Sequence, residues 1–132
     1  MKTYVPLNEG GKRAKERLWP VLDLWARYRK LRDAMTRMVD PYAVFPQEQN
    51  GAAVVWAQLR EAERQLTDRM RDNERAIVTC ATLTPIQLMV LTMRYVQGCD
   101  WPTVAERTGL ERARLYQEHR IGLNRIGGDR SR

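Results

Sequence analysis

Four hydrogen-bonding side chains lie close together near the carboxyl end of the chain, at Arg112, Arg114, Tyr116 and Gln117. An arginine can donate two hydrogen bonds to O6 and N7 of guanine, and a glutamine can pair with N6 and N7 of adenine. Each such pair discriminates against the wrong base by about 1–3 kcal/mol. If one helix presents these side chains to solvent, they could contact base edges in the major groove of duplex DNA. We therefore predict that these four residues contact bases.

Three more side chains, Thr103, Arg107 and Arg120, stand where contacts to the DNA backbone are expected. Contacts to phosphate hold a protein in register on the duplex but do not read its sequence. The alternative is that all these polar residues form only the solvated face of amphipathic helices. We favour DNA contact because a short helical segment and a glycine precede the polar segment.

Two helices are predicted before that glycine. Thr84 is a favourable N-cap and Pro85 a favourable first helical residue, so we expect a helix over residues 86–97, ended by Gly98. Asp100 can cap a second, shorter helix. The side chains expected to face inward are Ile86, Met89, Val90, Met93 and either Tyr95 or Val96 in the first helix, and Trp101, Val104 and Ala105 in the second.

Gly109 marks the turn into the last helix, because glycine adopts a positive φ angle that other residues tolerate poorly. This helix is expected over residues 111–126, with Leu115 and Leu123 turned inward. A short helix, a turn that contains glycine and a longer helix with polar outer positions are typical of a helix-turn-helix. We predict such a tri-helical domain over residues 83–127.

Residues 12–82 predict two long helices that could pack as an antiparallel hairpin. Apolar side chains recur at three- and four-residue steps over residues 12–39, and Pro20 either starts this helix or kinks it. Residues 40–50 contain two prolines and no periodicity, so we expect a loop. Over residues 51–81 the spacing approaches a heptad seam, which favours oligomerisation or contact with a partner. The predicted seam consists of Val55, Leu59, Ala62, Leu66, Arg69 or Met70, Asn73, Ile77 and Cys80.

The predicted fold is therefore all-α, with the helical hairpin followed by the tri-helical domain. We expect a flexible arm over residues 1–11, where two adjacent glycines precede the first helix. A short tail is expected over residues 128–132.

The charge of the chain agrees with a polyanionic partner. It carries 23 lysine and arginine residues against 16 aspartate and glutamate residues, a formal net charge of +7. An isoelectric point above about 9 is expected of nucleic-acid binders, although membrane-surface proteins and other polyanion binders share it. Arginine far outnumbers lysine, which suits bidentate contacts to phosphate or guanine. A genome rich in G and C would produce the same bias.

Several classes of function are disfavoured. No apolar stretch approaches the roughly 20 residues of a membrane span, and the amino terminus lacks the hydrophobic core of a signal peptide. Cys80 and Cys99 form neither a metal-ligand cluster nor a disulfide framework, so we expect a reduced cytoplasm, no metal and no cofactor. His119, the single histidine, is expected to pack or to contact phosphate. The sequence contains no phosphate loop, no nucleophile elbow and no paired carboxylates that would indicate an enzyme.

The carboxyl-terminal segment resembles region four of bacterial sigma factors, and most of all the sigma-like late-gene regulators of phages of the RinA/ArpU type. Three patterns carry the resemblance: L-x-x-R-Y-x-x-G from Leu91, W-x-x-V-A from Trp101, and L-Y-x-x-H from Leu115. The segment that shows the resemblance covers about a third of the chain. The resemblance implies a promoter-directed transcriptional regulator whose base-facing positions are Arg112, Arg114, Tyr116 and Gln117.

Three functions are consistent with these observations. The leading hypothesis is a sequence-specific phage or prophage regulator that binds double-stranded DNA, with RNA polymerase as a further partner. A homodimer or higher oligomer is expected, because one small module buries only about 600–1,000 Å² on DNA. The second hypothesis is a DNA-packaging protein akin to a small terminase subunit. The third is an interaction protein that contacts polymerase rather than DNA.

Overall fold

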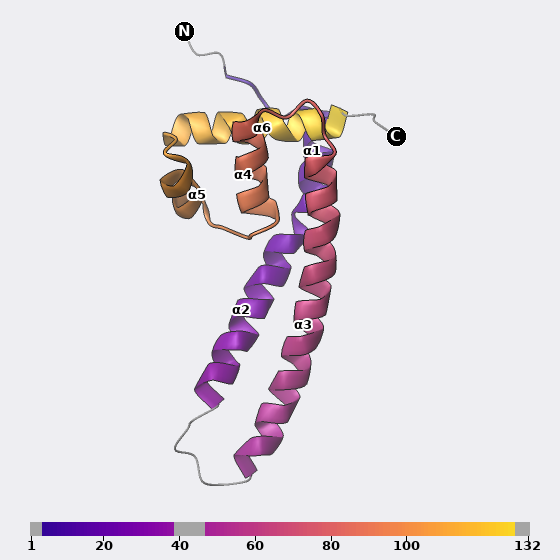
Figure 1. The fold of residues 1–132 in the computed structure, drawn as a ribbon, viewed down its shortest axis with the longest axis vertical. Coiled ribbons are helices and arrows are strands. Elements are labelled where there is room, and N and C mark those ends of the chain that lie inside the picture. Colours follow the sequence, from indigo (N-terminus) through magenta and orange to yellow (C-terminus); the bar gives the residue numbers. More distant parts are fainter. Residues whose placement is uncertain (1–3, 39–46, 129–132) are drawn as a thin grey trace.

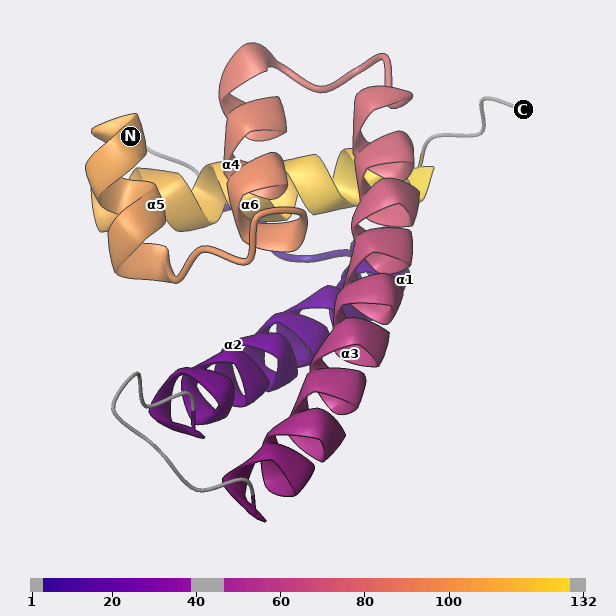
Figure 2. The same ribbon diagram turned by 60° about the horizontal axis from the view of Figure 1, so that its bottom comes forward.

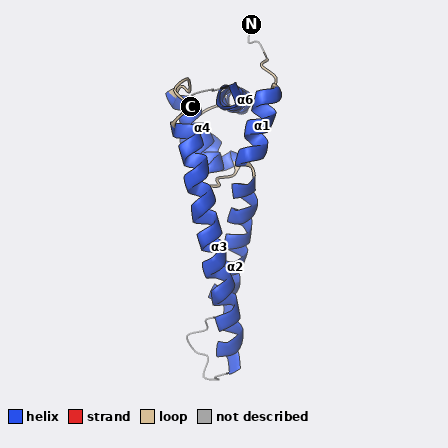
Figure 3. Ribbon diagram, turned by 90° about the vertical axis from the view of Figure 1, so that its right-hand side faces the viewer, coloured by secondary structure: helices blue, strands red, loops and turns tan. Residues whose placement is uncertain are grey.

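Six α-helices make up the part of the chain that the computed structural model describes, residues 4–38 and 47–128 (Figure 1). Loops join the helices, and no strand occurs within those two ranges, so the all-α prediction is confirmed there (Figure 3). The helices are α1 (Glu9–Leu18), α2 (Pro20–Met38), α3 (Gln47–Val78), α4 (Pro85–Tyr95), α5 (Trp101–Thr108) and α6 (Arg112–Gly128).

Helices α2 and α3 lie side by side and run in opposite directions, and this pair projects from the other four helices (Figure 1). We call the pair α2 and α3 the arm, as distinct from the flexible segment predicted over residues 1–11. The side chains of α3 that were expected along its seam are buried or partly buried, and Leu59, Ala62 and Leu66 are almost fully so. α3 begins at Gln47, within the segment predicted as a loop. Most of that predicted loop lies outside the described residues.

The chain bends between α1 and α2, at Trp19. Pro20 has no amide hydrogen and therefore interrupts the hydrogen-bond ladder, but Trp19 keeps helical φ and ψ angles of −56° and −40°. The amide of Leu22 donates to the Trp19 carbonyl at 2.9 Å, so the helix resumes at once. Of the two readings of Pro20, the kinked helix is the one observed. The bend turns Leu18 and Val21 into the core, where both are fully buried.

The amino-terminal residues differ from the expected flexible arm. Helix α1 already begins at Glu9, because the side chain of Asn8 caps it by accepting a hydrogen bond of 2.7 Å from the Gly11 amide. Residues 4–8, which we call the amino-terminal strap, run along α6 and are hydrogen-bonded to it. Residues 1–3 of the predicted arm and most of the predicted tail lie outside the described residues.

Glycines allow α1 to cross close to the far end of α6. A Cβ atom on Gly127 would overlap the backbone of Gly10, and one on Gly11 would overlap the side chain of Asn124. Gly10, Gly11 and Gly127 therefore serve helix packing, although the sequence alone favours a flexible amino-terminal segment and a tail.

Local signals set the ends of the last three helices, which form the carboxyl-terminal module (α4 to α6). Thr84 and Gln87 form a reciprocal capping box at the start of α4, with hydrogen bonds of 3.2 and 3.1 Å. The Asp100 side chain caps α5 by accepting from the Thr103 amide at 2.9 Å. Gly109 ends α5 with a φ angle of +70°, in the left-handed region predicted for it.

Two apolar clusters hold the helices together. The larger one joins α1, α2, α3, α4 and α6, and the smaller one joins the three helices of the carboxyl-terminal module through Val90, Val104 and Leu115. Met89 was expected to face inward but is 42% exposed, because Val90 and Leu91 occupy the inner face of α4. The residues of the larger cluster that are fully buried are Leu18, Val21, Ile77, Leu91, Tyr95 and Leu123.

Asn73 of α3 is a polar residue in the middle of the larger cluster and is 1% exposed. Its side-chain amide donates to the carbonyl of Leu18 at 2.9 Å and to the carbonyl of Tyr95 at 2.8 Å. These two carbonyls stand at the ends of α1 and α4, where the helix ladder leaves acceptors to be satisfied by other groups. One side chain thus ties the ends of two helices to α3.

Gly127→Ala is expected to lower the free energy of unfolding by about 2 kcal/mol, because the added methyl group meets backbone that cannot rotate away. Denaturation in urea would measure the loss. Gly128→Ala is the matched control, because a Cβ atom there meets nothing within 4 Å. Equal stabilities of the two variants would show that α1 does not cross α6 as described.

Asn73→Ala is expected to cost about 2 kcal/mol or more, because it leaves two buried carbonyl groups without this donor. The neighbouring exposed residue provides the control, and Glu74→Ala should change the free energy of unfolding by less than about 0.5 kcal/mol. Thermal or chemical unfolding of both variants measures the difference. A stability of Asn73→Ala equal to that of the control would contradict the bridging role.

Candidate nucleic-acid interface

Arg112 and Arg114 lie exposed on the first turn of α6. The helix crosses one end of the molecule, and α5 lies beside its amino-terminal end (Figures 1 and 2). Nothing lies within 4 Å of the position that a Cβ atom on Gly109 would take, so the turn between the two helices is open to solvent. Two of the four predicted base-contacting side chains thus project from an accessible helix end.

Tyr116 is partly buried. Its ring packs edge-on against the ring of Trp101 in α5, with centroids 5.2 Å apart and planes at 82°. This contact fixes the side chain between α5 and α6, so Tyr116 contributes to the packing of the two helices as well as to their surface.

Gln117 and Arg120 are engaged by the amino-terminal strap. The amide of Val5 donates to Gln117 Oε1 at 3.1 Å, and Arg120 Nε donates to the Val5 carbonyl at 2.8 Å. The guanidinium of Arg120 also lies over the ring of Tyr4, 4.3 Å from its centroid. The side chain of Asn124 adds two hydrogen bonds farther along the strap. Sequence reasoning placed Gln117 and Arg120 on the DNA-facing surface, and the structure places them under the strap.

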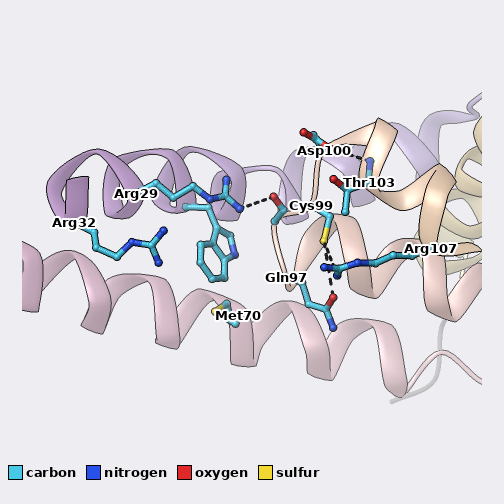
Figure 4. Close-up of a pocket in the computed structure, with 10 residues that line it drawn as sticks. Arg29, Arg32, Met70, Gln97, Cys99, Asp100, Thr103 and Arg107 are labelled. Carbon is cyan, nitrogen blue, oxygen red and sulfur yellow. Dashed lines mark hydrogen bonds between the residues drawn. The ribbon is translucent and has the colours of Figure 1, made fainter. Parts of the chain in front are cut away.

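The predicted phosphate contacts separate into two places. Thr103 and Arg107 line a groove of about 570 Å³ between α5 and the arm, whereas Arg120 lies at the strap (Figure 4). The groove also contains Arg29 and Arg32 of α2, which sequence reasoning did not single out. Both belong to the polar face of an amphipathic helix, and nothing in their local sequence distinguishes them from other exposed arginines.

Asp100 is the carboxylate among the groove's lining residues. The hydroxyl and amide groups of Thr103 hydrogen-bond to it and hold the pKa of this carboxyl below its usual value, with smaller contributions from Arg94 and Arg29. Asp100 therefore stays ionised and serves as the N-cap of α5.

His119 lies on the buried side of α6. Its Nε2 atom and the hydroxyl of Tyr95 form a hydrogen bond of 2.7 Å, and the edge of Trp101 packs 4.7 Å away between centroids. Burial, reinforced by the positive charges of Lys15, Arg94 and Arg120, lowers the pKa of His119 to about 3. Burial likewise raises the pKa of Tyr95. The pair is thus a neutral core contact, in agreement with the packing role expected for the histidine.

Arg94 lies between two tryptophan rings. Its guanidinium is 4.9 Å from the ring of Trp101 and 5.9 Å from that of Trp19, and it donates to the Cys99 carbonyl at 3.0 Å. The stack connects the bend after α1 to the start of α5.

No helix in the described part of the chain is long and apolar enough to cross a bilayer. Over the same residues, no three histidine, cysteine or acidic side chains gather as metal ligands would. Comparisons with protein-family models, with curated proteins and with solved structures found no significant match.

Acid is expected to destabilise the fold through His119. Its pKa is about 3 in the folded chain and near the ordinary 6.5 in the unfolded chain, so protons bind preferentially to the unfolded state between these values. The contribution of His119 to the free energy of unfolding is complete above pH 6.5. It falls by about 2 kcal/mol as the pH drops from about 7 to about 5. Urea denaturation at both pH values would measure this loss. His119→Gln, which cannot titrate but can still hydrogen-bond to Tyr95, should lose about 2 kcal/mol less over that interval, and an identical pH dependence in the two proteins would refute the assignment.

Proposed function

We propose that the protein binds duplex DNA as a sequence-specific transcriptional regulator, with α5 and α6 acting as a helix-turn-helix and α6 entering the major groove. The observation that carries the proposal is the pair of exposed guanidinium groups, Arg112 and Arg114, on the first turn of α6 directly after the left-handed turn at Gly109. Base-contacting residues of such modules stand at this end of the second helix.

The packing of α6 supports this role, because a recognition helix must hold a fixed angle to the rest of its domain. Leu115 and Leu123 are fully buried, and Leu115 packs in the small cluster with Val90 and Val104. Trp101 holds the ring of Tyr116 from the side of α5. The arginines of the first turn therefore project from a backbone that the rest of the module fixes, which lowers the entropic cost of binding.

The strap is the reason to propose Arg112 and Arg114 as the first base contacts. Gln117 and Arg120 exchange hydrogen bonds with Val5, so contacts from these side chains to DNA would replace contacts to the strap. The net charge of +7 supplies attraction that does not depend on sequence.

The resemblance of residues 83–127 to region four of sigma factors, and to phage late-gene regulators, is the reason to propose promoter DNA as the target and RNA polymerase as a further partner.

Val54 and Trp56 support an oligomer. Val54 is 59% exposed and Trp56 is 50% exposed, and both lie on the part of α3 far from the carboxyl-terminal module. A second copy that covers these side chains would bury apolar surface and place two recognition helices on one DNA molecule.

A protein-interaction role is the second candidate. Leu88 and Met89 leave apolar surface on α4, at 37% and 42% exposure, and the strap engages two of the residues that were expected to face DNA. In this case the module would bind polymerase or another regulator through α4.

Arg112→Ala/Arg114→Ala is expected to abolish sequence preference. Selection from a pool of randomised duplexes would give the preferred sequence, and gel shifts would then give the dissociation constants. The double variant should lose at least about 2 kcal/mol of binding to that sequence, roughly 30-fold in Kd, because two donors to base edges are removed.

Arg60→Ala/Arg75→Ala on α3 is the control, because it removes the same charge from exposed positions outside the module. It should retain the ratio between preferred and random duplex. If the wild-type protein fails to bind any duplex at about 50 mM salt, where attraction to phosphate is strong, the interaction role replaces DNA binding.

A further inference from the structure

We propose that the groove between the arm and α5 is a binding site for the phosphate backbone of duplex DNA, in which Arg29 and Arg32 of α2 act together with Arg107 of α5. The proposal rests on the proposed function and extends it, because it gives the arm a direct part in DNA contact. The bases would be read by α6, and the backbone beside them would pass along this groove.

The groove collects cations from two helices that are far apart in the sequence. Arg29 and Arg32 line one wall and Arg107 lines the other, while Asp100 is the carboxylate among the lining residues (Figure 4). None of these three arginines forms an ion pair with a residue that the structure describes. Three positive charges against one negative charge leave the groove attractive to an anion.

Neighbouring groups hold two of these guanidinium groups in place. Arg29 lies over the ring of Trp25, 5.0 Å from its centroid, and donates to the carbonyl of Gly98 at 2.9 Å. Arg32 lies over the ring of Tyr28 at 5.7 Å. An arginine has five N–H donors, and these contacts use few of them. Most donors on the arm side of the groove are therefore available to phosphate oxygens.

The carboxylate of Asp100 does not cancel this field. It caps α5 through Thr103 and so faces the positive end of that helix, which compensates part of its charge. Its lowered pKa keeps it in the role of a cap rather than of a proton donor to a bound phosphate.

The spacing of the cations favours a nucleic-acid backbone over a single small anion. In Figure 4 the guanidinium groups of Arg29, Arg32 and Arg107 lie at separate places along the groove and do not converge on one point. Duplex DNA carries a phosphate charge about every 1.7 Å along its axis, so cations that are spread out can each meet a different phosphate. In helix-turn-helix complexes the first helix crosses the backbone, and here that helix is α5, one wall of the groove.

The first test is the salt dependence of binding to a duplex of random sequence. Each phosphate contact contributes about 0.9 to the slope of log K against log salt concentration. Arg29→Ala/Arg32→Ala should therefore reduce the slope by about 1.8, while Arg60→Ala/Arg75→Ala, which removes the same charge outside the groove, should change it little. Arg32→Glu alone, which spares the hydrogen bond from Arg29 to Gly98, should weaken binding at least as much as Arg32→Ala.

The second test uses the thiol of Cys99, which lines the groove and is partly exposed. In a Cys80→Ala background it is the one remaining cysteine, so its alkylation by iodoacetamide reports on the groove with every arginine still in place. Saturating duplex should slow the alkylation at least about fivefold, whereas inorganic phosphate at equal phosphate concentration should not, because binding of a backbone depends on several phosphates together.

The outcomes separate this proposal from the proposed function. Binding of duplex that depends on Arg112 and Arg114, with Cys99 unprotected and the slope unchanged in Arg29→Ala/Arg32→Ala, would overturn the groove and leave the helix-turn-helix intact. Protection by inorganic phosphate alone would assign the groove to a small anion and also overturn the proposal. Absence of any duplex binding would overturn both.

Discussion

The amide of Asn73 is the contact on which the arrangement of the helices depends. It donates to carbonyls at the ends of α1 and α4 from a side chain that is almost completely buried, so both helix ends must stay in register with α3. Two further contacts act nearby, because Trp25 donates to the carbonyl of Val96 and Arg29 to that of Gly98. Together they attach the loop after α4 to the arm. The groove between the arm and α5 exists because these contacts set its two walls.

Features determined by neighbouring residues could be predicted from the sequence. Thr84, Asp100 and Gly109 act within a few residues of themselves, as caps and as a left-handed turn, and all three were assigned correctly. The periodicity of α3 identified Asn73 and Ile77 as inward-facing because a helix repeats its faces regularly, whatever packs against it. Arg112 and Arg114 were predicted to be exposed for the same reason, and they are.

Features that depend on distant residues were not predictable. The crossing of Gly10 and Gly127 and the hydrogen bonds from the strap to Gln117 and Arg120 join the two ends of the chain, and no local pattern records them. The polar surface of α6 was correctly recognised as a surface, but what covers it depends on tertiary packing. The partnership of Arg29 with Arg107 is of the same kind, because two unremarkable exposed arginines become neighbours only after the arm and α5 pack together.

The strap also determines the order in which parts of the chain can assemble during translation. Val5 is bonded to Gln117, 112 residues later, so this contact cannot form until α6 has left the ribosome. The two helices of the arm pair over much shorter separations, and the entropy lost in closing a loop grows with its length. Nascent α1 therefore remains without its α6 partner while α2 to α5 are synthesised. The contact between the strap and α6 can therefore form only after the other five described helices have been synthesised.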